Sequence, residues 1–180
     1  MFRLLKSGVL SLALLASLNA VVMAADPFGK TCGSFNGVVA YSNGTNGYFS
    51  NVQNSANGYS TAYKWQCAEF AARYYKLVYG MQVRGGDANS WYTSAKSKGL
   101  RSFANGGTTM PAVGDILCSN YSTGHVAIVR EVGSNYIKVI QQNWANNSAD
   151  NSMTLSMTFS GGKHTVAAAG SYRWQGLLRK

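Results

Sequence analysis

The second half of the chain is a succession of short apolar runs, and this pattern constrains the fold more than any other feature. Between residues 115 and 178, turn-forming Gly, Ser and Asn separate five runs rich in β-branched or aromatic residues: DILCS, HVAIVREV, YIKVIQQNW, MTLSMTF and SYRWQGLL. Such runs are typical of neighbouring antiparallel strands. Two helical patterns precede them, over 66–79 before Gly80 and over about 88–98 before Gly99. We therefore expect an α+β domain with N-terminal helices packed on an antiparallel β-sheet.

The first 24 residues have the pattern of a secretory signal peptide. Arg3 and Lys6 precede an apolar run from Val9 to Leu18, and small residues follow up to Ala24. An uncleaved membrane anchor is the alternative, but the run is shorter than the roughly 18–20 residues that a spanning helix needs. We therefore expect cleavage after Ala24, a secreted or periplasmic location, and no stable membrane span after cleavage.

The remaining chain, of about 156 residues, is long enough for one domain with its own core. Residues 25–62 are rich in Gly, Asn, Ser and Tyr, which favour turns, so we expect a loop-rich N-terminal segment with a short strand at Val38–Tyr41. Residues 63–180 carry the helical and strand patterns and are expected to form the domain.

The charge of the chain indicates an acidic partner. Sixteen Lys and Arg residues against six Asp and Glu residues give a net charge of +10. A domain this basic associates with polyanions, such as an acidic cell-wall polymer, an anionic membrane surface or nucleic acid. Nucleic acid is the weakest of the three, because the basic residues are scattered and no groove-reading motif is present. We expect no nucleic-acid partner.

Three cysteines leave one thiol over if a disulfide forms. Cys67 begins the first helical pattern, where the N-terminal N–H groups and the helix dipole lower the pKa of a thiol. It is either a nucleophile, half of a disulfide, or a packed apolar residue. If Cys67 stays a thiol, Cys32 and Cys118 either pair with each other or both remain ordinary buried thiols.

A thiol nucleophile needs a base, normally histidine. His164 lies in a Gly-rich polar stretch and is expected to be solvated, whereas His125 opens a strand directly after Gly124, where a side chain can face a cleft. His125 is therefore the candidate base, with a purely structural histidine as the alternative.

The hairpin after His125 supplies a third group that could orient the imidazole. If the hairpin is centred on Gly133, Gln141 faces His125 and Asn143 lines the same side of the sheet. Centring it half a residue later brings Gln142 opposite His125 instead. The apolar pattern does not decide between the two registers, although we favour Gln141.

Several segments together resemble one known family. WQCAEFAARYY, NSWYTSAKSKG, PAVGDILC, GHVAIV and VIQQNW are similar, in order and spacing, to the CHAP family of cysteine, histidine-dependent amidohydrolases/peptidases. The resemblance runs from about Tyr63 to the C-terminus. It implies a papain-like α+β fold and cleavage of amide bonds, commonly in peptidoglycan. It also implies Cys67 as nucleophile, His125 as base, Gln141 as orienting residue and Asn143 as a further polar residue of the site.

The sequence departs from the family at Gln141, where the family often has Glu. A neutral amide can hold one imidazole tautomer through its carbonyl oxygen, but it offers no negative charge to a developing imidazolium. Activity with a different pH profile and loss of catalysis are both compatible with this substitution.

Three further residues are candidates for substrate contact. Gln66 either serves helix entry or contributes to an oxyanion site, for which the Cys67 N–H is the better donor. Trp91 and Trp144 are core residues or walls of a groove, and Trp144 is the better candidate to face substrate.

No carboxylate pair suits glycoside hydrolysis and no Cys/His cluster has zinc spacing, so we expect no metal and no cofactor.

The sequence therefore predicts an exported cysteine amidase or endopeptidase acting on peptidoglycan peptides. One alternative is a catalytically idle wall-binding module of the same fold. Another is an antibacterial amidase toxin, which would be paired with an immunity protein.

Overall fold

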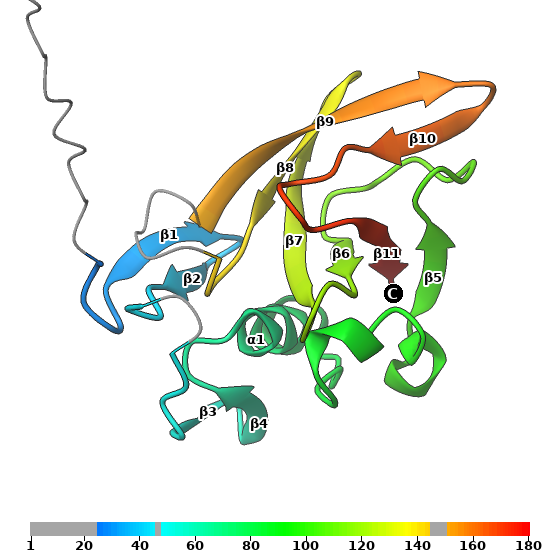
Figure 1. The fold of residues 1–180 in the computed structure, drawn as a ribbon. Helices are drawn as coiled ribbons and strands as arrows, with labels where there is room; N and C mark the ends of the chain where they lie inside the picture. The colour runs from blue at the N-terminus through cyan, green and yellow to red at the C-terminus, as the bar shows by residue number, and fades with distance from the viewer. Residues whose placement is uncertain (1–24, 46–47, 145–150) are drawn as a thin grey trace, which may run out of the picture.

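A seven-stranded antiparallel sheet is the largest element of the protein (Figure 1). The computed structural model describes residues 25–45, 48–144 and 151–180, so the predicted signal peptide lies outside the described residues. The strand order is β10-β9-β8-β7-β6-β11-β5. In chain order the strands are β5 (Arg101–Ala104), β6 (Ile116–Ser119), β7 (His125–Val132), β8 (Tyr136–Ile140), β9 (Ser152–Ser160), β10 (Lys163–Val166) and β11 (Trp174–Arg179).

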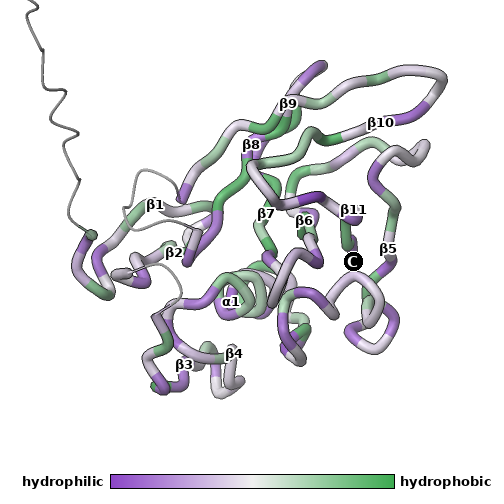
Figure 2. Tube along the Cα trace, viewed as in Figure 1, coloured by the Kyte–Doolittle hydropathy of each residue, from purple (hydrophilic) through white to green (hydrophobic). Residues whose placement is uncertain are grey.

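The sheet curls until its two outer strands approach each other. His164 in β10 exchanges backbone hydrogen bonds with the chain after β5: its N–H donates to the Gly107 carbonyl and its carbonyl accepts from Gly106, both at 2.8 Å. His164 was expected in a solvated turn, and its strand position corrects that expectation. The inside of the curl is apolar, with Leu117, Val139 and Trp174 among its buried side chains. Figure 2 shows the hydrophobic character of the central strands.

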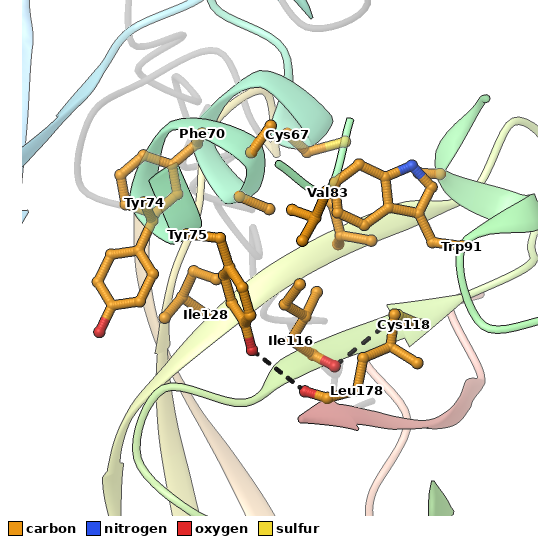
Figure 3. Packing of buried hydrophobic residues seen from close by; sticks show 14 of the residues in the cluster. Cys67, Phe70, Tyr74, Tyr75, Val83, Trp91, Ile116, Cys118, Ile128 and Leu178 are labelled. Carbon is orange, nitrogen blue, oxygen red and sulfur yellow. Dashed lines mark hydrogen bonds between the residues drawn. The ribbon is translucent and has the colours of Figure 1, made fainter. Parts of the chain in front are cut away.

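One α-helix, α1 (Cys67–Tyr79), packs on the other face of the sheet. Phe70, Tyr74 and Tyr75 on this helix are buried together with side chains of β6, β7 and β11 (Figure 3). The helix ends at Gly80 as predicted: its φ of 71° is left-handed, which glycine adopts without strain, and its N–H bonds back to the Lys76 carbonyl.

The prediction of a second helix is wrong, and so is the expected papain-like α+β class. Residues 88–98 form two short 3₁₀ helices, η1 (Ala88–Ser90) and η2 (Ala95–Lys98), so α1 is the only α-helix among the described residues and the fold is mostly β. Serine and threonine hydroxyls explain the break, because they compete for the helix carbonyls. The hydroxyls of Thr93 and Ser94 both donate to the Ser90 carbonyl, at 3.1 and 2.7 Å.

The N-terminal segment contains more regular structure than expected. The strand at Val38–Tyr41 is confirmed as β2, but it pairs with β1 (Thr31–Phe35), and a second hairpin joins β3 (Gln53–Ala56) to β4 (Tyr59–Tyr63). Both hairpins turn at an Asn-Gly dipeptide with positive φ at both residues, the combination that two-residue hairpin turns require.

Cys32 and Cys118 do not form a disulfide with each other. The Cys32 thiol on β1 donates to the Lys30 carbonyl, whereas Cys118 is fully buried in β6 with its thiol toward the Ile116 carbonyl. Both therefore remain thiols, but the expectation that both are buried is correct only for Cys118, because Cys32 is partly exposed. No helix within the described ranges is long and apolar enough to cross a membrane.

Candidate active site

Cys67 is the first residue of α1 and lies against the start of β7. Its side chain is buried and faces a cleft of about 680 Å³ that His125 also lines. Burial raises the pKa of the Cys67 thiol above its ordinary value, although hydrogen bonds from the N–H groups of Val126, Ala68 and Cys67 itself act to lower it. The expectation that the helix start would depress this pKa is therefore wrong, because desolvation outweighs the N–H groups.

His125 is the first residue of β7 and is also buried. Its Nε2 lies 2.9 Å from Oε1 of Gln141. A carbonyl oxygen only accepts, so this contact places the proton on Nε2 and leaves the lone pair of Nδ1 available as a base. The predicted contact between His125 and Gln141 is thus present in the structure.

The register that suggested this contact is nevertheless wrong. Ile128 pairs with Ile140 and Val129 with Val139, and a β-bulge follows before Glu131 pairs with Lys138. Neither register considered from the sequence has these pairs. Gln141 directly follows the last residue of β8 and reaches the imidazole from there.

Cys67 and His125 are both uncharged at neutral pH. Burial lowers the pKa of His125 from 6.5 to about 4, and the hydrogen bond with Gln141 opposes this shift only in part. Together with the raised pKa of Cys67, this gives a neutral thiol beside a neutral imidazole at neutral pH.

Gln66 and Asn143 are hydrogen-bonded to each other at the edge of the cleft. Asn143 Nδ2 donates to Gln66 Oε1 at 2.8 Å, and Gln66 Nε2 donates to the Tyr48 carbonyl at 2.8 Å. Because the Gln66 amide N–H is engaged with that carbonyl, the backbone N–H groups at the start of α1 are better placed to stabilise an oxyanion. Asn143 lines the same cleft as His125, as expected.

The two candidate tryptophans have different surroundings. Trp91 is fully buried in the core beside α1, where its indole N–H donates to the Gly86 carbonyl at 3.2 Å, and it supports the wall of the cleft (Figure 3). Trp144 packs edge-on against the imidazole of His125, with ring centroids 4.8 Å apart, but it does not line the cleft.

Several residues that line the cleft were not predicted from the sequence. The ring centroid of Tyr172 lies 5.9 Å from that of His125, and Phe49 and Tyr63 pack edge to face, with centroids 4.5 Å apart, on another part of the wall. Arg84 and Asp87 add one charge of each sign. These residues come from loops and hairpins far apart in the chain, so no spacing rule could bring them together.

A buried polar network joins α1 to the end of β8. Glu69 accepts hydrogen bonds from Arg73 at 2.7 and 3.2 Å and from Gln142 at 3.0 Å. Gln142 also donates to the carbonyl of Gln66, the residue before the nucleophile, at 3.2 Å, and accepts from the Tyr41 N–H at 2.9 Å. The two adjacent glutamines therefore have separate contacts: Gln141 holds the imidazole and Gln142 holds the helix.

Gly124 allows the chain to pass closely behind His125. Its φ is +83°, and a Cβ at this position would stand 2.0 Å from the backbone nitrogen of Asn89. Asn89 N–H in turn donates to the Thr123 carbonyl at 3.0 Å. Only glycine lets η1 dock at the start of β7, and this docking places the 84–88 loop beside Cys67.

Among the described residues, no group of three or more His, Cys, Asp or Glu side chains could hold a metal ion. In a search of curated proteins no match was found. Residues 56–143 match the CHAP domain, and this span contains Cys67, His125, Gln141 and Asn143. Residues 56–143 of the chain are therefore a CHAP domain, and the CHAP domain family is generally hydrolase-related, of the amidase and peptidase type.

Proposed function

We propose that this protein is an exported cysteine amidase or endopeptidase that cleaves amide bonds in peptidoglycan peptides. The observation that carries the proposal is the common cleft of Cys67 and His125, with the imidazole held by Gln141. A thiol at a helix start, a base and a group that orients the base are the three parts that nucleophilic amide cleavage requires.

In the proposed reaction, Sγ of Cys67 attacks the carbonyl carbon of the scissile amide while its proton moves to Nδ1 of His125. The carbonyl electrons move to the oxygen, and N–H groups at the start of α1 stabilise the oxyanion. As the oxyanion collapses, the C–N bond breaks and Nδ1 returns the proton to the leaving amine. A thioester on Cys67 remains.

Water then completes the cycle by the reverse sequence of proton transfers. Nδ1 takes a proton from water as its oxygen attacks the thioester, the C–S bond breaks, and the proton passes to sulfur. The products are a carboxylic acid and the regenerated thiol. Gln141 keeps its contact with Nε2 throughout, so Nδ1 stays directed toward the cleft.

Peptidoglycan as the substrate is supported by charge and by the predicted signal peptide. A net charge of +10, or about +8 without Arg3 and Lys6 of the predicted signal peptide, favours residence near an acidic cell-wall polymer. Export would bring the enzyme to that polymer, whether the wall belongs to the producing cell or to a competitor. A toxin acting on a competitor would require an immunity protein in the producer.

The test is mass spectrometry of purified peptidoglycan after incubation with the enzyme. We expect new fragments whose mass has increased by one water per broken amide. Cys67→Ala and His125→Ala should reduce the rate of cleavage by at least a thousandfold, with unchanged circular dichroism.

The matched controls are Cys32, which lies outside the core, and the second histidine, His164. Cys32→Ser and His164→Ala alter residues that do not line the cleft, so they should retain activity. Equal cleavage by the wild type and both active-site variants would exclude the mechanism. Binding to peptidoglycan without any cleavage would instead identify the idle wall-binding module.

A further inference from the structure

Asp87 differs from the other acidic residues that the structure describes. The structure describes five acidic residues, and the four besides Asp87 are in ion pairs with N–O distances of 2.5 to 2.9 Å: Asp26 with Lys30, Glu69 with Arg73, Asp115 with Arg179 and Glu131 with Lys138. Asp87 makes no ion pair within the described ranges, although the chain has a large excess of basic residues. It lines the cleft that contains Cys67.

The backbone around Asp87 is held in place by its neighbours. The carbonyls of Gly85, Gly86 and Asp87 accept hydrogen bonds from Lys98 Nζ at 2.6 Å, from the Trp91 indole at 3.2 Å and from Ser90 Oγ at 2.8 Å. These hydrogen bonds therefore hold the loop that carries Asp87 in place.

The Asp87 carboxylate itself remains available. Aspartate directly before a helix usually caps the helix with its side chain, but Asp87 precedes η1 without a side-chain capping bond. Arg84, three residues earlier, directs its guanidinium to Ser60 Oγ at 2.6 Å. A fixed, exposed carboxylate that neither caps nor pairs is suited to bind a cation brought by a ligand.

The negative charge of Asp87 opposes the proposed attack by Cys67, and a cationic ligand would remove this opposition. A negative charge near Cys67 disfavours the thiolate character that sulfur acquires during attack, and Asp87 contributes to the raised pKa of this thiol. An ammonium group bound to Asp87 would neutralise that charge when substrate is present.

We propose that Asp87 is a specificity-determining residue that binds an ammonium group of the substrate next to the scissile amide. This inference rests on the proposed amide cleavage and narrows its substrates to peptides with a free amine close to the bond that is cut. Cell-wall stem peptides carry such amines at a free N-terminus or on a diamino acid. The carboxylate accepts hydrogen bonds from the ammonium.

The experiment measures kcat and KM for stem peptides that differ only in amine charge. The probes are a tetrapeptide with a diamino acid and a free N-terminus, and its derivatives acetylated at either amine. For the wild type, we expect acetylation of the recognised amine to lower kcat/KM at least tenfold. In Asp87→Asn this preference should disappear, and in Asp87→Glu it should persist in part.

Glu131→Gln is the matched control, because it removes the same charge from a residue that does not line the cleft. It should keep the wild-type preference. Thermal unfolding of Asp87→Asn should match that of the wild type, since the carboxylate forms no ion pair or capping bond with the residues that the structure describes.

Other outcomes separate this inference from the proposed function. Wild-type cleavage of all the peptides at equal rates, or an equal loss on all of them in Asp87→Asn, would overturn the role of Asp87 and leave the amidase intact. Failure of the wild type to cleave any peptide or intact peptidoglycan would overturn the amidase and the role of Asp87 with it.

Discussion

At the scale of single residues, the burial of His125 sets the pH range in which it could act as the base in the proposed reaction. The imidazole must be neutral to act as a base, and burial brings its pKa to about 4. The base form therefore predominates above pH 4, well below the range of an ordinary histidine. The rate should fall on acidification only near this value.

Replacing Gln141 by Glu tests this dependence directly. A carboxylate 2.9 Å from Nε2 would favour the imidazolium, so the pKa of His125 should rise by about one to three units. The acid limb of the kcat/KM profile should move toward neutral pH by the same amount. Gln82→Glu places the same charge on an exposed residue outside the cleft and should leave the limb in place. An unchanged limb in Gln141→Glu would contradict the contact between Gln141 and the reacting imidazole.

Sequence reasoning found these residues but not their charge states. Cys67, His125 and Gln141 stand out by type and position along the chain, and all three meet in the structure. The helix start predicted a lowered thiol pKa, whereas burial raises it. Burial of a thiol depends on the strands that cover it, so a local pattern cannot supply it.

At the scale of elements, the network of Glu69, Arg73 and Gln142 fixes α1 relative to β8. Glu69 is fully buried and the Arg73 side chain is only 8% exposed. Since Gln142 bonds both Glu69 and the carbonyl before Cys67, the network links the nucleophile to the strand end that carries Gln141. The distance between nucleophile and base should therefore depend on these buried contacts.

Removing one charge of the Glu69–Arg73 pair should lower the free energy of unfolding more than removing both charges. Glu69→Ala or Arg73→Ala leaves a buried charge without its partner, and each should lower the free energy of unfolding by about 3–5 kcal/mol. Glu69→Leu combined with Arg73→Met should lose less, because no charge remains buried. Urea unfolding of the four proteins measures this difference. A double variant as unstable as the sum of the single variants would show that the two residues act independently.

Elements were predictable where their signals are local. The end of α1 at Gly80 follows from one glycine, and the central strands follow from their β-branched runs. The Asn-Gly dipeptides at 36–37 and 57–58 indicate hairpin turns, but they lie in a segment whose Gly- and Asn-rich composition favoured the prediction of loops. The β7–β8 register was not predictable, because the bulge beside Val129 shifts the pairing without a mark in the sequence.

At the scale of the whole molecule, the curl of the sheet creates two apolar regions instead of one. One lies between α1 and the sheet and the other lies inside the curl. The closing strands β5 and β10 lack the long apolar runs of the central strands, so the sequence pattern did not reveal them. Closure depends on contacts between residues about 60 positions apart, such as Asn105 with Val166 at 2.8 Å.

Burial of His125 at the junction of α1 and the sheet should also make the stability of the whole domain pH-dependent. Its folded pKa of about 4 is below the ordinary value of 6.5, so the unfolded chain binds the proton more readily. The stabilisation is complete above pH 6.5 and is lost as pH falls toward 4, by about 3 kcal/mol over this interval. Urea unfolding at pH 7 and pH 4.5 measures the loss. His125→Asn removes the titrating group, so its free energy of unfolding should change less over the same interval, and an equal change in both proteins would contradict a neutral, buried His125.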